Sequence, residues 1–186
     1  WASAIRVNEV FAEQSSMKAP AQSSKEKKTT DAVIFEQVDF TYAKAKAPSL
    51  SGISFCAAKG QTIGIIGGTG SGKSTLVNLI PRFYDVSRGK ILVNGVPVQE
   101  YSFDDLRRKI GIVPQKSVLF AGTIRENMCW AKEDATDEEI WRALEIAQAK
   151  DFVKKKREGL EEPVATGGKN FSGGQRQRLC IARALV

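Results

Sequence analysis

A glycine-rich run at residues 67–75 has the residue types and the spacing needed to bind phosphate. Residues 67–74 fit the pattern G-x-x-x-x-G-K-S, in which glycines let backbone N–H groups turn toward phosphate oxygens. Lys73 is placed to reach the β- and γ-phosphates, and the Ser74 hydroxyl is placed to bind Mg²⁺. The alternative is a strand-to-helix turn that binds nothing. The run is Gly67, Gly68, Thr69, Gly70, Ser71, Gly72, Lys73, Ser74 and Thr75.

Two elements must hold this loop in place. The apolar residues Ile63–Ile66 before it predict a fully buried parallel strand. The apolar residues 76, 77, 79 and 80 after it predict one side of a helix that begins near Lys73. The positive end of that helix would add to the attraction for an anion. Together these features predict a site for a nucleoside triphosphate.

A second candidate site lies near the end of the chain. Ser172 and Gln175 form a capping-box pattern, which predicts a helix beginning near Gly173. Gly173 and Gly174 leave the backbone uncovered at that helix N-terminus, where an anion can bind. Taken alone, this pattern favours an ordinary well-capped helix over an anion-binding site.

Together, the two segments resemble the ABC ATPases, whose signature motif is usually Leu-Ser-Gly-Gly-Gln. Phe171 stands in the place of the Leu. The resemblance implies that Ser172, Gly173, Gly174 and Gln175 contact ATP held by the phosphate loop of a second nucleotide-binding domain. The resemblance covers approximately Val33 to Val186.

Further residues take on roles through this resemblance. Tyr42 would stack on the adenine, although a half-buried strand aromatic is the alternative. Gln115 would contact Mg²⁺ or the attacking water, which makes Gln115 and Lys73 the implied catalytic residues and Ser74 and Gln115 the implied metal contacts. The implied cofactors are ATP and Mg²⁺.

The implied fold is α/β, a P-loop NTPase core with a parallel sheet, an antiparallel β subdomain and an α-helical subdomain. Residues 1–13 resemble the segment that follows the last transmembrane helix of an exporter. Residues 14–31, rich in Ser, Lys, Ala and Thr, predict a flexible linker. Residues 32–186 would be the nucleotide-binding domain.

The implied function is that of the ATPase domain of a multidrug- or lipid-exporter-like ABC transporter. Residues 1–11 and 122–127 favour an exporter over a soluble ABC ATPase of DNA repair or translation. The expected partners are a second nucleotide-binding domain and the transmembrane domain of the same chain, at the cytoplasmic face of the cell membrane. A catalytically degenerate half of a heterodimeric exporter is a further alternative. Exporters usually carry an acid in the segment that matches residues 165–168, and this chain has none there.

The family's magnesium-binding Asp, its general-base Glu and its γ-phosphate-sensing His follow the signature helix, and this chain contains no histidine. We therefore expect residues 1–186 to be an incomplete domain that does not hydrolyse ATP by itself.

The composition agrees with a cytosolic domain. Cys56, Cys129 and Cys180 are expected to be reduced thiols, and neither a transmembrane run nor a signal peptide is evident. The net charge of +7 is attributed to solvated surface residues, so no nucleic-acid partner is expected. Asn94-Gly95 predicts a hairpin, Pro97 predicts an edge position, and Thr136 with Glu139 predicts another capped helix.

Overall fold

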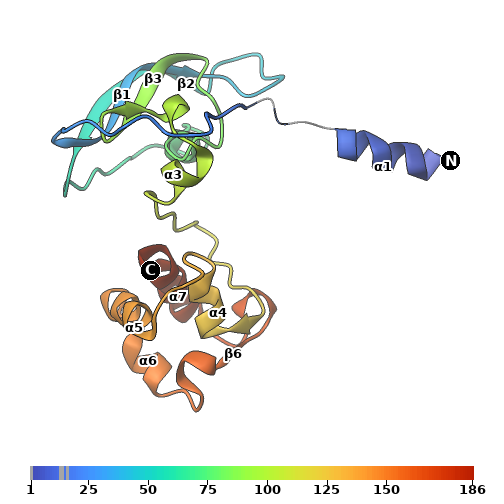
Figure 1. The fold of residues 1–186 in the computed structure, drawn as a ribbon, viewed down its shortest axis with the longest axis vertical. Coiled ribbons are helices and arrows are strands. Elements are labelled where there is room, and N and C mark those ends of the chain that lie inside the picture. The colour runs from blue at the N-terminus through green and yellow to red at the C-terminus, as the bar shows by residue number, and fades with distance from the viewer. Residues whose placement is uncertain (1, 13–14, 16) are drawn as a thin grey trace. The chain divides into compact units, whose positions relative to one another are not determined.

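A computed structural model describes residues 2–12, 15 and 17–186 of the chain. The chain divides into two compact units, Trp1–Ile110 and Gly111–Val186. Parts of the predicted segments 1–13 and 14–31, namely Trp1, Glu13, Gln14 and Ser16, lie outside the described residues. The first unit is built on a sheet and the second unit on helices (Figure 1).

The first unit contains a four-stranded antiparallel sheet with the order β2-β1-β3-β4. Its strands are β1 (Asp31–Phe40), β2 (Leu50–Ala58), β3 (Arg88–Val93) and β4 (Val96–Pro97). The β3–β4 turn has positive φ at Asn94 (48°) and Gly95 (75°), which confirms the predicted hairpin. Pro97 lies on the edge strand β4, as its missing N–H requires.

One face of this sheet packs into the core of the first unit. Phe35 stands opposite both Phe55 and Ile91, and its side chain is buried. Helix α2 (Lys73–Leu79) contributes Leu76 and Leu79 to the same core. The 3₁₀ turn Val98–Glu100 and helix α3 (Phe103–Arg107) complete it, with Tyr101 donating a 2.9 Å hydrogen bond to the Val93 carbonyl.

The predicted buried strand at Ile63–Ile66 is wrong for this structure. Residues 61–68 form no strand, and the Ile66 side chain is 98% exposed. A buried strand must pair its backbone N–H and C=O groups with a neighbouring strand, and no described strand pairs with residues 61–68. Every strand pairing among the described residues is antiparallel.

The described part of the predicted linker makes specific contacts within the first unit. The backbone N–H of Ser24 donates to the Glu100 carbonyl at 2.9 Å. The Glu26 carboxylate accepts hydrogen bonds from Lys109 at 2.7 Å and Asn94 at 3.3 Å. At its beginning, the buried Arg82 donates to the Lys18 carbonyl at 2.9 Å. We call residues 17–30 the strap.

Helix α1 (Ala2–Ala12) forms within residues 1–13, the segment that resembles the one following the last transmembrane helix of an exporter. Its apolar side chains Ile5, Val7, Val10 and Phe11 are all more than half exposed. None of the helices formed by the described residues combines the length and the apolar character that crossing a bilayer requires.

The second unit consists of short helices around one apolar core. Its helices are α4 (Ile124–Cys129), α5 (Asp137–Ile146), α6 (Lys150–Lys154) and α7 (Gly173–Leu185). Strands β5 (Gly122–Thr123) and β6 (Pro163–Val164) pair antiparallel, and 3₁₀ turns lie at Gly159–Glu161 and Thr166–Gly168. The capping box predicted at Thr136 and Glu139 is confirmed, and Thr123 with Glu126 forms another.

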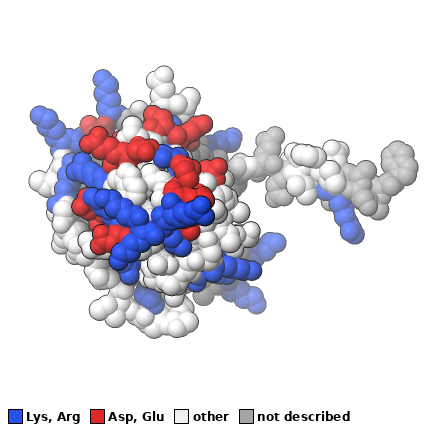
Figure 2. Space-filling view, turned by 90° about the horizontal axis from the view of Figure 1, so that it is seen from below, with Lys and Arg blue, Asp and Glu red and all other residues white. Residues whose placement is uncertain are grey.

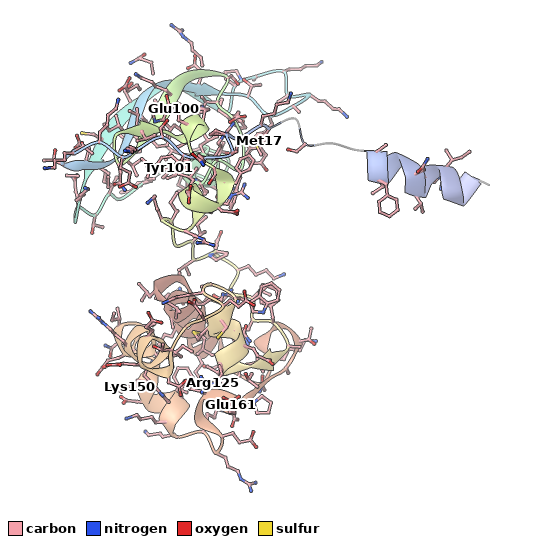
Figure 3. All side chains as sticks on the ribbon, viewed as in Figure 1. Met17, Glu100, Tyr101, Arg125, Lys150 and Glu161 are labelled. Carbon is pink, nitrogen blue, oxygen red and sulfur yellow. The ribbon has the colours of Figure 1, made fainter. Side chains whose placement is uncertain are left out.

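Polar contacts fix the loops of this unit. The buried Asn127 side chain accepts from the Phe120 N–H and donates to the Phe120 and Thr123 carbonyls, each at 2.9 Å. Arg125 binds both Asp137 and Glu161, and these carboxylates keep the Arg125 pKa above its ordinary value (Figure 3). Acidic and basic side chains are interspersed on the face drawn in Figure 2.

Candidate nucleotide-binding site

The phosphate loop folds through the backbone geometry of its glycines. Gly72, which precedes α2, has φ 86°, and a Cβ there would lie 2.8 Å from both the Leu50 side chain and the Ser49 carbonyl. Only glycine fits such a position without strain. Gly70 also has positive φ, at 83°. These two residues turn the chain so that α2 begins at Lys73, as predicted.

The Lys73 side chain points into the loop. Its ammonium nitrogen donates to the Gly67 carbonyl at 2.7 Å, the Gly68 carbonyl at 2.6 Å and the Ser71 hydroxyl at 3.3 Å. A cation is therefore held inside a curved backbone segment, within reach of any anion that enters. Charge-assisted hydrogen bonds from such an ammonium to phosphate oxygens are stronger than those to neutral carbonyls.

The first turn of α2 adds further groups to the loop. Its initial backbone N–H groups have no acceptor earlier in the helix. Ser74 is exposed, and among the described residues its hydroxyl has no hydrogen-bond partner. A small oxygen donor of this kind, beside a phosphate loop, fits Mg²⁺, which prefers oxygen ligands and retains several waters.

Tyr42 lies just beyond the end of β1, so it is not part of a strand. Its side chain is half-buried. Its hydroxyl is 3.0 Å from the hydroxyl of Thr75, a buried residue in the first turn of α2. Its ring stands at 83° to Phe40 and at 86° to Tyr84. The structure thus brings the predicted adenine contact and the phosphate loop together.

The predicted signature segment lies in the second unit, at the start of α7. Helix α7 begins at Gly173, which confirms the prediction from sequence. Ser172 accepts from the Gln175 N–H at 3.3 Å, and Gln175 accepts from the Ser172 N–H at 3.0 Å. Gly173 and Gly174 have no atom within 4 Å of an added Cβ, so their backbone is open to a ligand.

Phe171, the departure from the usual Leu, belongs to the core of the second unit. It is 3% exposed, and its ring lies 6.5 Å from that of Phe152. An apolar residue of either type can fill such a position. Arg176 holds the preceding segment to α7 by donating to the Phe171 carbonyl at 2.7 Å and the Gly168 carbonyl at 3.4 Å.

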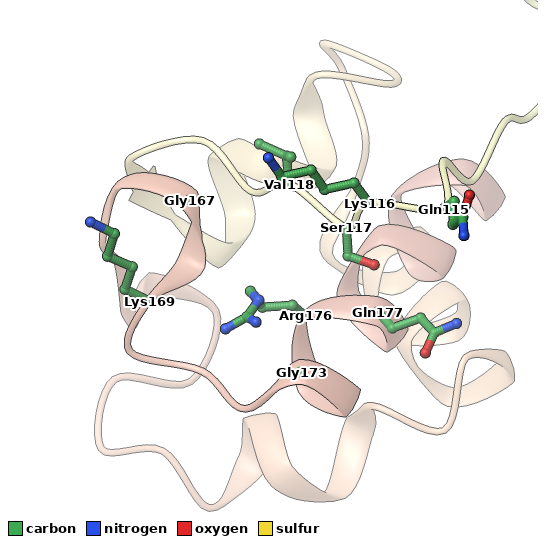
Figure 4. A pocket seen from close by; sticks show the side chains of 9 residues that line it. All are labelled: Gln115, Lys116, Ser117, Val118, Gly167, Lys169, Gly173, Arg176 and Gln177. Atoms are coloured by element: carbon green, nitrogen blue, oxygen red, sulfur yellow. The ribbon is translucent and has the colours of Figure 1, made fainter.

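Gln115 lines a cavity of about 680 Å³ in the second unit (Figure 4). Its walls come from the segment around Gln115, from the loop before the signature and from the first turns of α7. Three of its lining side chains are cationic, and none is acidic. Its lining residues are Gln115, Lys116, Ser117, Val118, Gly167, Lys169, Gly173, Arg176 and Gln177.

The structure therefore collects the predicted residues into two groups. Tyr42 and Thr75 meet within the first unit, where Lys73 enters the loop. Gln115 and Gly173 line one cavity in the second unit. Sequence reasoning missed Tyr84 and Lys169, because neither belongs to a spacing pattern and each joins its group only through the fold.

Comparison with protein families matches residues 50–186 to the ABC transporter family. An uncharacterized ABC transporter ATP-binding protein of Mycobacterium tuberculosis is 51% identical over 150 residues, covering 79% of this chain and 25% of that protein. A probable multidrug resistance ABC transporter ATP-binding/permease protein of Bacillus subtilis, YheI, is 42% identical over 185 residues, covering 100% of this chain and 32% of that protein.

Among solved structures, a bacterial Atm1-family ABC exporter with ATP bound matches with a TM-score of 0.89 and 32% sequence identity. The match covers 99% of this chain and 32% of the exporter. The chain thus spans about a quarter to a third of the length of the proteins it matches. This similarity confirms the predicted fold class, whereas the pairing of residues 61–68 into a parallel sheet is not seen.

Proposed function

Because the chain belongs to the ABC transporter family, we propose that it is the nucleotide-binding part of an exporter that uses ATP binding and hydrolysis to move a substrate across a membrane. The observation that carries this proposal is the Lys73 ammonium, which is held inside the loop 67–75 by two backbone carbonyls. A triphosphate entering the loop would replace these carbonyls with charged oxygens.

The residues of the first unit would bind most of the nucleotide. Backbone N–H groups of the segment Gly67–Thr75 would surround the phosphates, and Lys73 would contact the β- and γ-oxygens. The Tyr42 ring would stack on the adenine, close to the loop to which its hydroxyl is bonded. Base and phosphates are then recognised by groups in one folding unit.

Ser74 and Gln115 are the residues proposed to contact Mg²⁺. When bound, the metal neutralises charge on the phosphates during their transfer. Ser74 offers an exposed hydroxyl at the loop, and Gln115 offers an exposed amide in the second unit. In catalysis, Lys73 would stabilise charge on the γ-phosphate, and Gln115 would orient the attacking water.

Ser172, Gly173, Gly174 and Gln175 are proposed to act on nucleotide held by a second nucleotide-binding domain. The uncovered backbone at Gly173 and Gly174 supports this role, because a phosphate can approach it without a clash. The other proposed partner is a transmembrane domain in the same chain. Residues 1–13 would then follow the last transmembrane helix. Residues 14–31 would connect this segment to the nucleotide-binding domain, residues 32–186, which would bind ATP on the cytoplasmic face of the membrane.

The proposal is tested by the variant Lys73→Ala in a titration with a fluorescent ATP analogue. We expect the affinity to fall at least about tenfold, because a charge-assisted hydrogen bond contributes roughly 1.5–3 kcal/mol. Lys59→Ala is the matched control, since Lys59 is exposed in the same unit but lies outside the loop. Equal affinities of wild type and Lys73→Ala would refute the nucleotide site.

A further inference from the structure

Three aromatic rings meet beside the phosphate loop. Tyr42 stands at 83° to Phe40 with ring centroids 4.7 Å apart, and at 86° to Tyr84 with centroids 5.2 Å apart. Tyr84 also contacts Phe40, with centroids 5.6 Å apart. Perpendicular packing places the positive edge of one ring against the negative face of another, which is a favoured arrangement.

The Tyr42 ring needs such support because its backbone does not fix it. Phe40 is the last residue of β1, and residues 41–49 connect β1 to β2 without regular structure. A side chain in such a connection samples several rotamers unless neighbours restrict it. Its described restraints are the Phe40 ring, the Tyr84 ring and the hydrogen bond to Thr75.

Among these neighbours, Tyr84 is the one that neither fills the core nor belongs to the phosphate loop. Phe40 is 3% exposed and fills the core, and Thr75 belongs to the phosphate loop. Tyr84 is 42% exposed, and within the described chain its hydroxyl forms no hydrogen bond. Its described ring contacts are with Phe40 and Tyr42.

We propose that Tyr84 is a positioning residue that holds the Tyr42 ring in the orientation that receives the nucleotide base. This inference rests on the proposed function and deepens it. Tyr84 would act through Tyr42 without touching the phosphates, so its contribution applies only to ligands that carry a base. Removing the Tyr84 ring should weaken ATP binding and leave binding of inorganic triphosphate unchanged.

The experiment measures the affinities of ATP and of inorganic tripolyphosphate for the full-length protein and its variants. We expect Tyr84→Ala to weaken ATP binding about 3- to 10-fold, as the loss of one aromatic pair would, with tripolyphosphate binding unchanged. Tyr84→Phe should bind ATP like the wild type, because it keeps the ring. Tyr84→Leu, which keeps the apolar volume without the ring, should resemble Tyr84→Ala and replaces it if that variant does not fold.

Phe83→Ala is the matched control. Phe83 is also 42% exposed, but its described ring contact is with Arg107, at 5.5 Å, and not with Tyr42. Its ratio of ATP to tripolyphosphate affinity should equal that of the wild type. The inference is overturned if Tyr84→Ala and Tyr84→Leu leave this ratio unchanged, or if Phe83→Ala changes it equally. Failure of the wild type to bind either ligand would instead refute the proposed function.

Discussion

Gly173 is a position where a substitution can test ATP-dependent dimerisation without disturbing the fold. It is the first residue of α7, and a Cβ added there would meet no atom within 4 Å. An acidic residue in the first turn of a helix also stabilises that helix. A substitution at Gly173 should therefore act on what approaches this surface.

We predict that Gly173→Glu abolishes ATP-dependent dimerisation of the full-length protein and leaves ATP binding to a single domain unchanged. The new carboxylate would repel a triphosphate brought by the partner domain. Light scattering with and without ATP measures the effect, and Gly173→Gln, of equal size without the charge, separates repulsion from bulk. ATP-dependent dimers of Gly173→Glu would contradict the proposed role of the signature.

At the residue scale, the sequence predicted what depends on local type and spacing. Lys73 and the start of α7 at Gly173 are specified within a few residues of chain. Tyr84 was missed because its contact with Tyr42 exists only after β1 and the segment following α2 are brought together. Phe171 could be recognised as a departure, but its burial in the core required the fold.

At the scale of elements, the strap departs most from what composition suggests. Ser23 donates to Asp105 at 2.5 Å, and Glu26 is held by Lys109 and Asn94. Hydrogen bonding to Lys109 is the main cause that lowers the Glu26 pKa, while burial raises the Tyr101 pKa to about 12. A composition rich in Ser and Lys indicates weak burial, but it does not reveal side-chain partners across the fold.

We predict that Glu26→Gln lowers the free energy of unfolding at pH 7 by roughly 0.2–1 kcal/mol, the range for exposed ion pairs. Because the folded pKa of Glu26 lies below its ordinary value of 4.5, the stabilisation is complete above that pH. The stabilisation is lost as the pH falls through the lowered pKa that Glu26 has in the folded state.

Urea unfolding across this pH range measures the difference, and trypsin cleavage at Lys25, Lys27 and Lys28 reports release of the strap. Glu100→Gln is the control, since Glu100 is exposed and belongs to no ion pair within the described residues. If the difference in the free energy of unfolding between wild type and Glu26→Gln stayed constant down to acidic pH, the carboxylate charge would not be the cause of the stabilisation.

At the scale of the whole molecule, residues 63–66 stand out because they carry exposed isoleucine side chains on a backbone that pairs with no described strand. Ile63 is 39% exposed, Ile65 40% and Ile66 98%. The sequence predicted their strand character from apolarity alone, but pairing depends on distant segments that must lie beside them. Unpaired extended backbone with apolar side chains is a template for association with other chains.

We predict that the 186-residue chain self-associates through this segment and that Ile66→Lys raises the concentration at which association begins. A charge on an unpaired segment opposes pairing with a second copy. Static light scattering over a concentration series measures it. Ile146→Lys is the control, because Ile146 is 59% exposed but lies in α5, where the backbone is already bonded. If Ile66→Lys and Ile146→Lys raised this concentration equally, association would depend on exposed apolar side chains in general and not on the unpaired segment.

The capping boxes of the second unit also bear on how this part of the protein can change over evolutionary time. Helices α4, α5 and α7 each begin with a Ser or Thr that exchanges hydrogen bonds with a Glu or Gln three residues later. Since the two residues of each capping box lie within one turn of helix, the start of the helix does not depend on the length of the loop before it. Lineages can therefore lengthen or shorten those loops while the helices keep their register against the shared core.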